Sequence, residues 1–269
     1  MVLRELGYFF AALGFFTRLP VPAWVAHDAD QLSQAPRYLP LIGVIVGLIG
    51  AVVTELTALL LPISVAVLLG IAATVWITGA FHEDGFADAC DGFGGGWDKA
   101  RVLAIMKDSR LGSFGAIGLV LLFFLKWQAL VDVDASETLF DGATFLEPPY
   151  GAVLPFALVA AHAISRLAAL VLMANLDYVR EDESTKSRSL TPPLRPIGWL
   201  PAIFFGLAPC LWLPLPQVLV ALLFVVLSAA LAARYFQRRI GGYTGDCLGA
   251  VQQVCELAFY LGLLCEFAW

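Results

Sequence analysis

Long apolar runs separated by proline, glycine and charged loops dominate the pattern of this sequence. A helix needs about 20 apolar residues to cross the hydrocarbon core of a bilayer. Runs of roughly that length predict seven crossings, which fall at 39–61, 63–81, 111–131, 151–174, 197–213, 216–233 and from 250 to the C-terminus. The earlier run at 6–16 is too short to cross, and we expect an interfacial or re-entrant helix there. The predicted fold class is all-α, a polytopic integral membrane helical bundle that forms a single domain over residues 1–269.

Three local signals refine this picture. Gly43 and Gly47 form a G-x-x-x-G pattern in the first long span, which allows close contact between helices. Two prolines forbid a regular helix through the segment TRLPVP at 17–22. Asp98 can cap a short helix at 99–107.

Composition supports the membrane assignment. Hydrophobic residues make up 60% of the chain, charged residues only 14%, and the mean hydropathy is +0.82, whereas soluble domains carry about 25% charged residues. A net charge of −6 without a basic face argues against nucleic acid as a partner. Scattered histidines and five cysteines without a C-x-x-C pair predict neither a zinc site nor a disulfide.

The distribution of Lys and Arg predicts the orientation. Most of them fall in three loops, at 82–111, 175–196 and 234–249, which the alternation of spans places on one side of the membrane. The loop at 132–149 carries no Lys or Arg and falls on the other side. Cytoplasmic loops are enriched in Lys and Arg, so we expect the three basic loops, and the connection at 18–37, to face the cytoplasm.

The stretch HEDGFADACDGFGGG at 82–96 carries the candidate chemistry. If 74–91 is one continuous helix, Asp84, Asp88 and Asp91 stand at i, i+4 and i+7, within about 60° of one another. Two such charges 4 Å apart repel by about 4 kcal/mol at an effective dielectric constant of 20. A divalent cation relieves that repulsion, and an all-oxygen ligand set suits Mg²⁺ or Mn²⁺.

A solvated acidic helix end is the plainer interpretation of this charge run. Two features favour the metal site: the glycines that close the run, and the segment MKDSRLGSFG at 106–115, with Lys107 and Arg110. These two cations can mark the cytoplasmic side, clamp a phosphate, or do both. Acids for a metal, bases for phosphate and Gly-rich turns together indicate phosphoryl transfer.

Ionisable residues inside the spans are further candidates, because such groups are costly in a membrane and usually functional or paired. Asp246 heads the last helix, and Glu256 lies on the same inward face. We weigh a functional role for Glu256 against a structural pairing with Arg166. Arg166 can reach a phosphate, snorkel or pair with Glu256. Lys126 is expected to be a snorkelling anchor near the outer end of its span.

Several motifs resemble one known family, the cobalamin synthases, or adenosylcobinamide-GDP ribazoletransferases. In the family's order they are TRLPVP at 17–22, RYLPLIGVIVG at 37–47, H-x-DGxADxxDG at 82–92, MKDSRLGSFG at 106–115 and GGYTGDCLGA at 241–250, with Glu256 beyond. The chain departs from the family at Glu83, where an apolar residue is usual; Glu83 is either an extra ligand or a wet flank of the helix. The loop at 180–196 matches weakly, so no site is carried over to it.

The resemblance implies a membrane enzyme that joins adenosylcobinamide-GDP to α-ribazole or its 5′-phosphate and releases GMP. Its expected place is the bacterial cytoplasmic (inner) membrane, with the active site built from the loops at 82–111 and 234–249 on the cytoplasmic face. The expected partners are these substrates and the lipid bilayer; an oligomer is compatible with the sequence.

The residues themselves fit this chemistry, and we assign roles to them. The metal ligands for Mg²⁺ are expected to be Asp84, Asp88 and Asp91. The general base is expected to be one of three carboxylates, Asp91, Asp108 or Asp246. The substrate-binding candidates are Lys107, Arg110, Arg18, Arg166 and Glu256.

Two other classes remain as alternatives. A CDP-alcohol phosphotransferase of phospholipid synthesis also uses clustered aspartates and Mg²⁺, but its motif reads DGxxAR, and here Asp88 stands where the arginine would be. A cation transporter would carry its ionisable residues near the middle of the bilayer. The strongest cluster here falls at a predicted membrane face.

Overall fold

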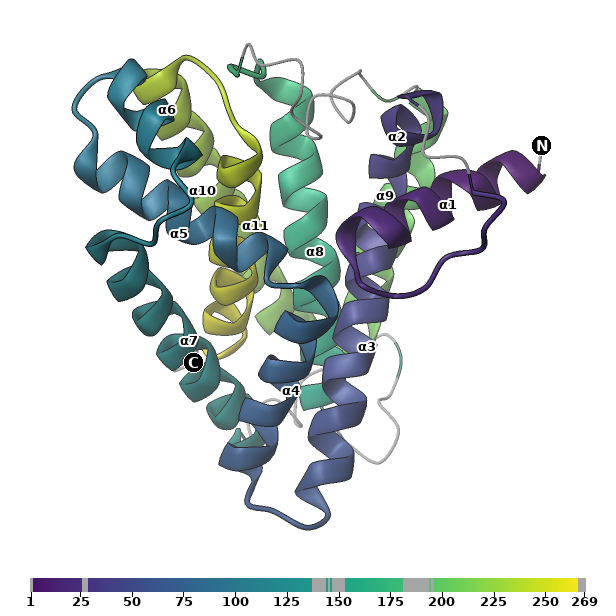
Figure 1. Cartoon of the computed structure of the whole chain (residues 1–269). Coiled ribbons are helices and arrows are strands. Elements are labelled where there is room, and N and C mark those ends of the chain that lie inside the picture. The colour runs from purple at the N-terminus through teal and green to yellow at the C-terminus, as the bar shows by residue number, and fades with distance from the viewer. Residues whose placement is uncertain are drawn as a thin grey trace.

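The computed structural model describes residues 2–25, 29–136, 144, 146, 153–180, 194 and 196–265. Within these residues the regular elements are helices (Figure 1). In chain order they are α1 (Val2–Phe16), α2 (Ala29–Gln34), η1 (Ala35–Tyr38), α3 (Leu39–Ala58), α4 (Ile63–Thr78), α5 (Phe81–Gly95), α6 (Lys99–Lys107), α7 (Ser113–Ala135), α8 (Leu154–Asn175), η5 (Pro196–Gly198), α9 (Trp199–Leu207), η6 (Ala208–Trp212), α10 (Leu215–Ile240) and α11 (Gly245–Leu263).

The predicted fold class, a polytopic helical membrane bundle, is confirmed. Four helical stretches are long and apolar enough to cross a membrane, and α4 with α5 makes a fifth if that bent pair is one span. The four are Gln31–Ala58, Ser113–Ala135, Leu154–Asn175 and Leu215–Ile240.

Two of the seven expected crossings fall outside this set. Pro196–Trp212 is a shorter apolar stretch, divided into η5, α9 and η6. Helix α11 has the length of a span, but polar residues such as Asp246, Gln253 and Glu256 lower its hydropathy.

The loop expected to lack Lys and Arg, 132–149, lies mostly outside the described residues, as do 181–193 and the end of the last expected span. The orientation derived from loop charges therefore stays a sequence-based prediction.

Helix α8 lies at the centre of the bundle, between α3 and α11 (Figure 1). The G-x-x-x-G contact is confirmed: side chains at Gly43 and Gly47 would overlap the α8 backbone near His162 and Val159. The cap of α6 is confirmed too, because the Asp98 side chain accepts a hydrogen bond of 2.9 Å from the Arg101 N–H. Local sequence signals thus predicted both the contact between α3 and α8 and the start of α6.

The expectation of one continuous helix over 74–91 is wrong. Helix α4 ends at Thr78, and α5 begins at Phe81 at an angle of 89° to it. Gly79 and Ala80 make the turn, with φ of 67° and 58°. The Arg18 guanidinium fills the space where a Gly79 side chain would stand, and the Arg18 N–H donates to the Ile77 carbonyl at 2.7 Å. Helix α5 therefore runs across the bundle rather than along it (Figure 1).

Helix α1 is a short helix outside the set of candidate spans, as expected for an interfacial element. Its anchor is Arg37, which is buried and pairs with Glu5 at 3.1 Å. The Arg37 guanidinium also lies over the Tyr8 ring, 4.9 Å from its centre. The motif RYLP thus holds the N-terminal helix against the bundle.

We expect Gly249→Ala to push α11 away from α5 and to lower the free energy of unfolding by about 1–3 kcal/mol. A Cβ on Gly249 would lie 2.9 Å from the His82 carbonyl oxygen and 3.2 Å from the Gly85 Cα, which are backbone atoms. Thermal unfolding in detergent measures the effect. Gly95→Ala is the matched control, because a Cβ there meets only the tip of the Ile105 side chain, at 3.3 Å. Equal melting temperatures for the two variants would contradict this close contact.

Candidate active site

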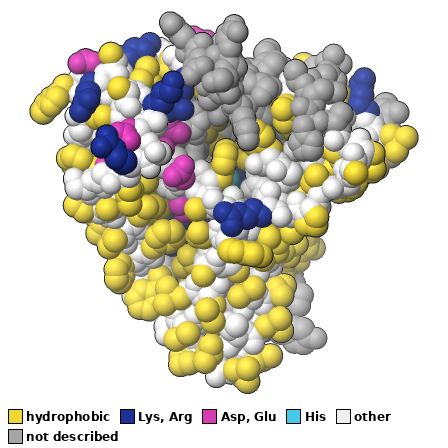
Figure 2. Space-filling view, in the orientation of Figure 1, with side chains coloured by type: hydrophobic (Ala, Val, Ile, Leu, Met, Phe, Trp, Pro, Cys, Tyr) yellow, Lys and Arg dark blue, Asp and Glu magenta, His cyan; other side chains and the backbone are white. Residues whose placement is uncertain are grey.

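Three carboxylates form an acidic cluster, defined here as Asp84, Asp88 and Asp246. The first two come from α5, and Asp246 comes from the first turn of α11. The glycine contact between α5 and α11 places Asp246 beside them, close enough for the three negative charges to repel. Figure 2 shows acidic side chains at a hollow in this face of the molecule, with Lys and Arg side chains around it. A positive charge beside these carboxylates would therefore stabilise the arrangement.

Arg180 supplies one positive charge to this cluster. Its Nη2 lies 2.5 Å from the Asp246 carboxylate and donates to the Met106 carbonyl at 3.2 Å. The Thr244 hydroxyl, which caps α11, also donates to Asp246, at 3.4 Å. One side chain thus joins three segments that are far apart in the sequence. No motif marks Arg180 in the sequence, because its loop is the weakest match to the family.

Asp91, an expected metal ligand and base, is engaged by the start of α7. Its two carboxylate oxygens accept hydrogen bonds from the N–H groups of Gly112 and Gly115, at 2.7 and 2.8 Å. These donors lie at the start of α7, where the helix dipole favours a negative charge. The structure therefore shows Asp91 holding the end of the MKDSRLGSFG segment against α5.

Among the described residues, no three His, Cys, Asp or Glu side chains converge on one metal position. The assignment of Mg²⁺ to Asp84, Asp88 and Asp91 stays a prediction, and Asp91 is the member whose oxygens are already occupied by backbone donors. Asp84 is exposed and Asp88 is half-buried.

The basic segment lies at the surface beside Met106. Lys107 ends α6, and Arg110 pairs with Asp108 at 2.5 Å. Hydrogen bonds from Arg110 lower the pKa of Asp108 to about 2, and the same contacts raise the pKa of Arg110. Arg180 contacts both the Met106 carbonyl and Asp246. Lys107, the residue after Met106, therefore starts close to the acidic cluster.

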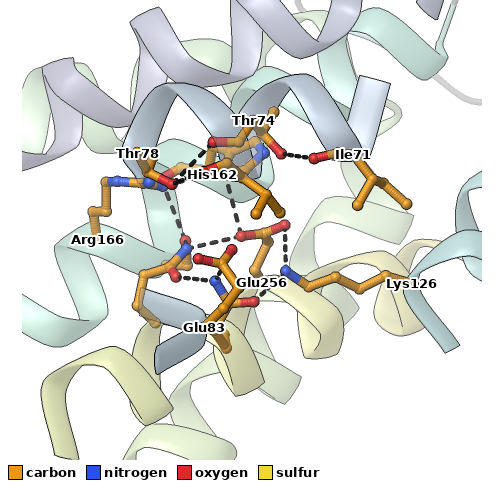
Figure 3. Close-up of polar contacts among 12 residues, drawn as sticks. Ile71, Thr74, Thr78, Glu83, Lys126, His162, Arg166 and Glu256 are labelled. Atoms are coloured by element: carbon orange, nitrogen blue, oxygen red, sulfur yellow. Dashed lines mark hydrogen bonds and ion pairs between the residues drawn. The ribbon is translucent and has the colours of Figure 1, made fainter. Parts of the chain in front are cut away.

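A buried network lies deeper in the bundle (Figure 3). It consists of Glu83, Lys126, Gln253, Glu256 and His162. Glu256 lies 2.8 Å from Lys126 Nζ and 3.3 Å from His162 Nδ1, and Gln253 contacts both Lys126 and Glu83. The network ties α5, α7, α8 and α11 together beneath the acidic cluster.

This network corrects three expectations. Lys126 is not a snorkelling anchor, because its side chain is only 4% exposed and pairs with Glu256. Glu256 pairs with Lys126 rather than with Arg166, whose Nη1 donates to the His162 carbonyl at 2.9 Å. Glu83 is neither a wet flank nor a member of the acidic cluster, because it is buried and accepts a hydrogen bond from Gln253.

Arg18 is exposed at the surface beside the bend between α4 and α5. Its substrate-binding assignment stays a prediction, as do those of Arg166 and Glu256.

The fold and the site together define a class: a polytopic helical membrane protein with an acidic cluster at one end of the bundle, bordered by arginine and a basic loop. A family model described as cobalamin-5-phosphate synthase matches residues 8–264. The chain belongs to this family, and it is a transferase of cobalamin synthesis. The resemblance seen in the sequence motifs is thereby confirmed.

Relatives agree with the family model over nearly the whole chain. The chain is 45% identical over 262 residues to a protein from Shewanella frigidimarina named adenosylcobinamide-GDP ribazoletransferase, covering 97% of this chain and 95% of that one. A protein of the same name from Leptothrix cholodnii is 44% identical over 268 residues, covering 98% and 97%. No solved structure matches the chain.

Proposed function

We propose that this protein transfers the phosphate of adenosylcobinamide-GDP that carries cobinamide to a hydroxyl of α-ribazole or α-ribazole 5′-phosphate. The ribazole oxygen bonds to that phosphorus, the bond from the phosphorus to the bridging oxygen breaks, and GMP leaves with that oxygen. The hydroxyl proton passes to a carboxylate. The products are adenosylcobalamin, or its phosphate, and GMP. The observation that carries this proposal is the acidic cluster, assembled from two helices and bordered by Arg180 and the basic loop.

The acidic cluster fits Mg²⁺ by its donor chemistry. It offers only carboxylate oxygens, and Mg²⁺ is usually held by one or two carboxylates together with substrate phosphates. We assign Asp84 and Asp88 to this role, since neither is taken up by an ion pair or a backbone donor among the described residues. When bound, the ion offsets negative charge on the diphosphate.

Among the three candidate bases, the contacts favour Asp246. A base works best when its pKa lies near the working pH, and Arg110 holds the pKa of Asp108 at about 2. Both oxygens of Asp91 already accept backbone N–H groups. Asp246 lies within the acidic cluster, and its partner Arg180 can stay beside it or turn to a phosphate oxygen.

Lys107 and Arg110 are proposed to hold the phosphates of the incoming substrate. Arg110 is 87% exposed and ends in the bidentate fork that suits phosphate. A phosphate here competes with Asp108 for the same guanidinium. The excess of Lys and Arg around the site supports its placement on the cytoplasmic side of the bacterial inner membrane.

The test is GMP release by the purified protein in lipid nanodiscs. With adenosylcobinamide-GDP, α-ribazole and Mg²⁺, we expect one GMP for each cobalamin formed, and EDTA should reduce the rate to background. Repeating the assay with α-ribazole 5′-phosphate ranks the two acceptors. CMP release from a CDP-alcohol, without GMP release, would instead assign the chain to phospholipid synthesis. Full activity in EDTA would remove the metal from the proposal.

A further inference from the structure

An apolar groove opens on the side of the bundle between α5, α10 and α11, with a volume of about 720 Å³. Its walls are mainly aromatic and aliphatic, with Phe86 and Phe93 from α5, Leu231 and Tyr235 from α10, and Val254 from α11. Helix α10 borders the surroundings of the protein here, because only 17% of its most apolar stretch is buried in the bundle. The groove therefore lies on the side of the bundle, along a helix that is long and apolar enough to span a membrane.

The groove lies on the opposite side of α5 from the acidic cluster. At 3.6 residues per turn, Phe86, Cys90 and Phe93 stand roughly 140–180° around the helix from the direction of Asp84 and Asp88. None of the residues that line the groove belongs to the acidic cluster or to the buried network. It is a separate site from the one described above.

Two arginines lie at one end of the groove. Arg234 and Arg238 stand at i and i+4 in the last two turns of α10, so they share a face of the helix, and both line the groove. Both are exposed, and neither forms an ion pair with a residue that the structure describes. Their neighbour Arg239 is engaged otherwise: it donates to the Gly96 carbonyl at 2.6 Å and lies over the Phe93 ring.

We propose that this groove binds one acidic phospholipid. An acyl chain lies along the apolar walls, and the phosphodiester is held by Arg234 and Arg238. A guanidinium binds phosphate oxygens through paired N–H donors, and its long side chain reaches the headgroup level from the end of a span. A net negative headgroup matches two positive charges, whereas the ammonium of a zwitterionic lipid offsets its own phosphate.

The occupant is a lipid rather than a soluble phosphate compound because most of the residues that line the groove are apolar. Free phosphate would contact the arginines alone and leave the walls of the groove without a partner. A bound acyl chain instead packs against the apolar walls of the groove, while its headgroup contacts the arginines. The lipid would then pack against the side of α5 that faces away from Asp84 and Asp88.

Native mass spectrometry of the whole protein in detergent tests the proposal with phosphatidylglycerol and phosphatidylcholine of the same acyl chains. We expect phosphatidylglycerol to bind at least tenfold more tightly, and Arg234→Gln/Arg238→Gln to reduce that preference to twofold or less. The matched control is Arg4→Gln/Arg101→Gln, which removes two exposed arginines outside the groove and should keep the preference. Equal binding of the two lipids, or an equal loss in both double variants, would overturn the proposal.

A second measurement on the unmodified protein locates the lipid. Phosphatidylglycerol with a photoreactive group in its acyl chain is cross-linked to the protein, and the labelled peptides are identified. We expect the label on the helix segments that line the groove, at 86–93, 228–238 and 250–255. A label spread evenly over exposed apolar helices such as α3 and α7 would show a general lipid boundary and would refute a specific site.

Discussion

We expect Asp88→Asn to lower the proposed release of GMP by about 100-fold or more and to leave the protein folded in the membrane. Asp88 lies in the acidic cluster beside Asp84 and Asp246. On the proposed function, removing its charge would weaken the attraction for the proposed Mg²⁺ and for the substrate phosphates that the ion accompanies. Loss of one group that stabilises charge in a reaction typically costs 10²–10³-fold in rate. The rate is measured as GMP formed per folded protein in nanodiscs, over a range of Mg²⁺ concentrations. We expect the Mg²⁺ concentration at half-maximal rate to rise as well.

The matched control is Asp98→Asn. Asp98 is an exposed aspartate of the same region, and its side chain caps α6. Asparagine caps a helix about as well as aspartate does, so this variant should keep the activity of the parent protein within a factor of about two. If Asp88→Asn kept full activity and full Mg²⁺ dependence, the acidic cluster would not be the metal site.

Lys126→Met strongly destabilises the protein, because it leaves the Glu256 carboxylate buried without its cation. Removing one partner of a buried ion pair typically costs about 3–5 kcal/mol. Lys126 and Glu256 are each only 4% exposed, and Gln253 alone cannot replace the positive charge. We expect a large fall in the melting temperature of the purified protein in detergent. Glu256→Gln should lower it as well, since it leaves Lys126 buried and charged.

The double variant Lys126→Met/Glu256→Gln separates charge from packing. It removes both the Lys126 ammonium and the Glu256 carboxylate, so no buried charge of this pair is left without its partner. We therefore expect it to be more stable than either single variant, and a double-mutant cycle measures the coupling free energy. Lys99→Met, at an exposed lysine of α6, is the control and should change stability by less than about 0.5 kcal/mol. Additive effects of the two single variants would show that Lys126 and Glu256 do not interact as a pair.

Length and hydropathy along the chain were enough to predict most of the helices. A span depends on a local run of apolar residues, and a cap depends on a side chain three residues away, so both are written in neighbouring positions. The close contact at Gly43 and Gly47 was predictable for a similar reason, since two small residues one turn apart leave space on one helix face. The family was predictable because its motifs are local as well.

The bend before α5 had no such signal. Ala80 adopts a positive φ that alanine rarely takes, and a glycine such as Gly79 is also found within membrane helices. The turn is held by Arg18, a residue far away in the sequence, whose guanidinium packs against Gly79. A contact of that kind exists only after the chain has folded.

The sequence by itself determined that Asp84, Asp88 and Asp91 share a stripe of one helix, because the helical repeat sets the direction of each side chain around its own axis. Only the tertiary structure decided what each of them faces. The start of α7 occupies Asp91, while α11 brings Asp246 to the other two. The same holds for Lys126, which lies near a span end but meets Glu256 across the bundle. Helical spacing is a local property, whereas the partner of a side chain depends on which helix packs opposite and at what height.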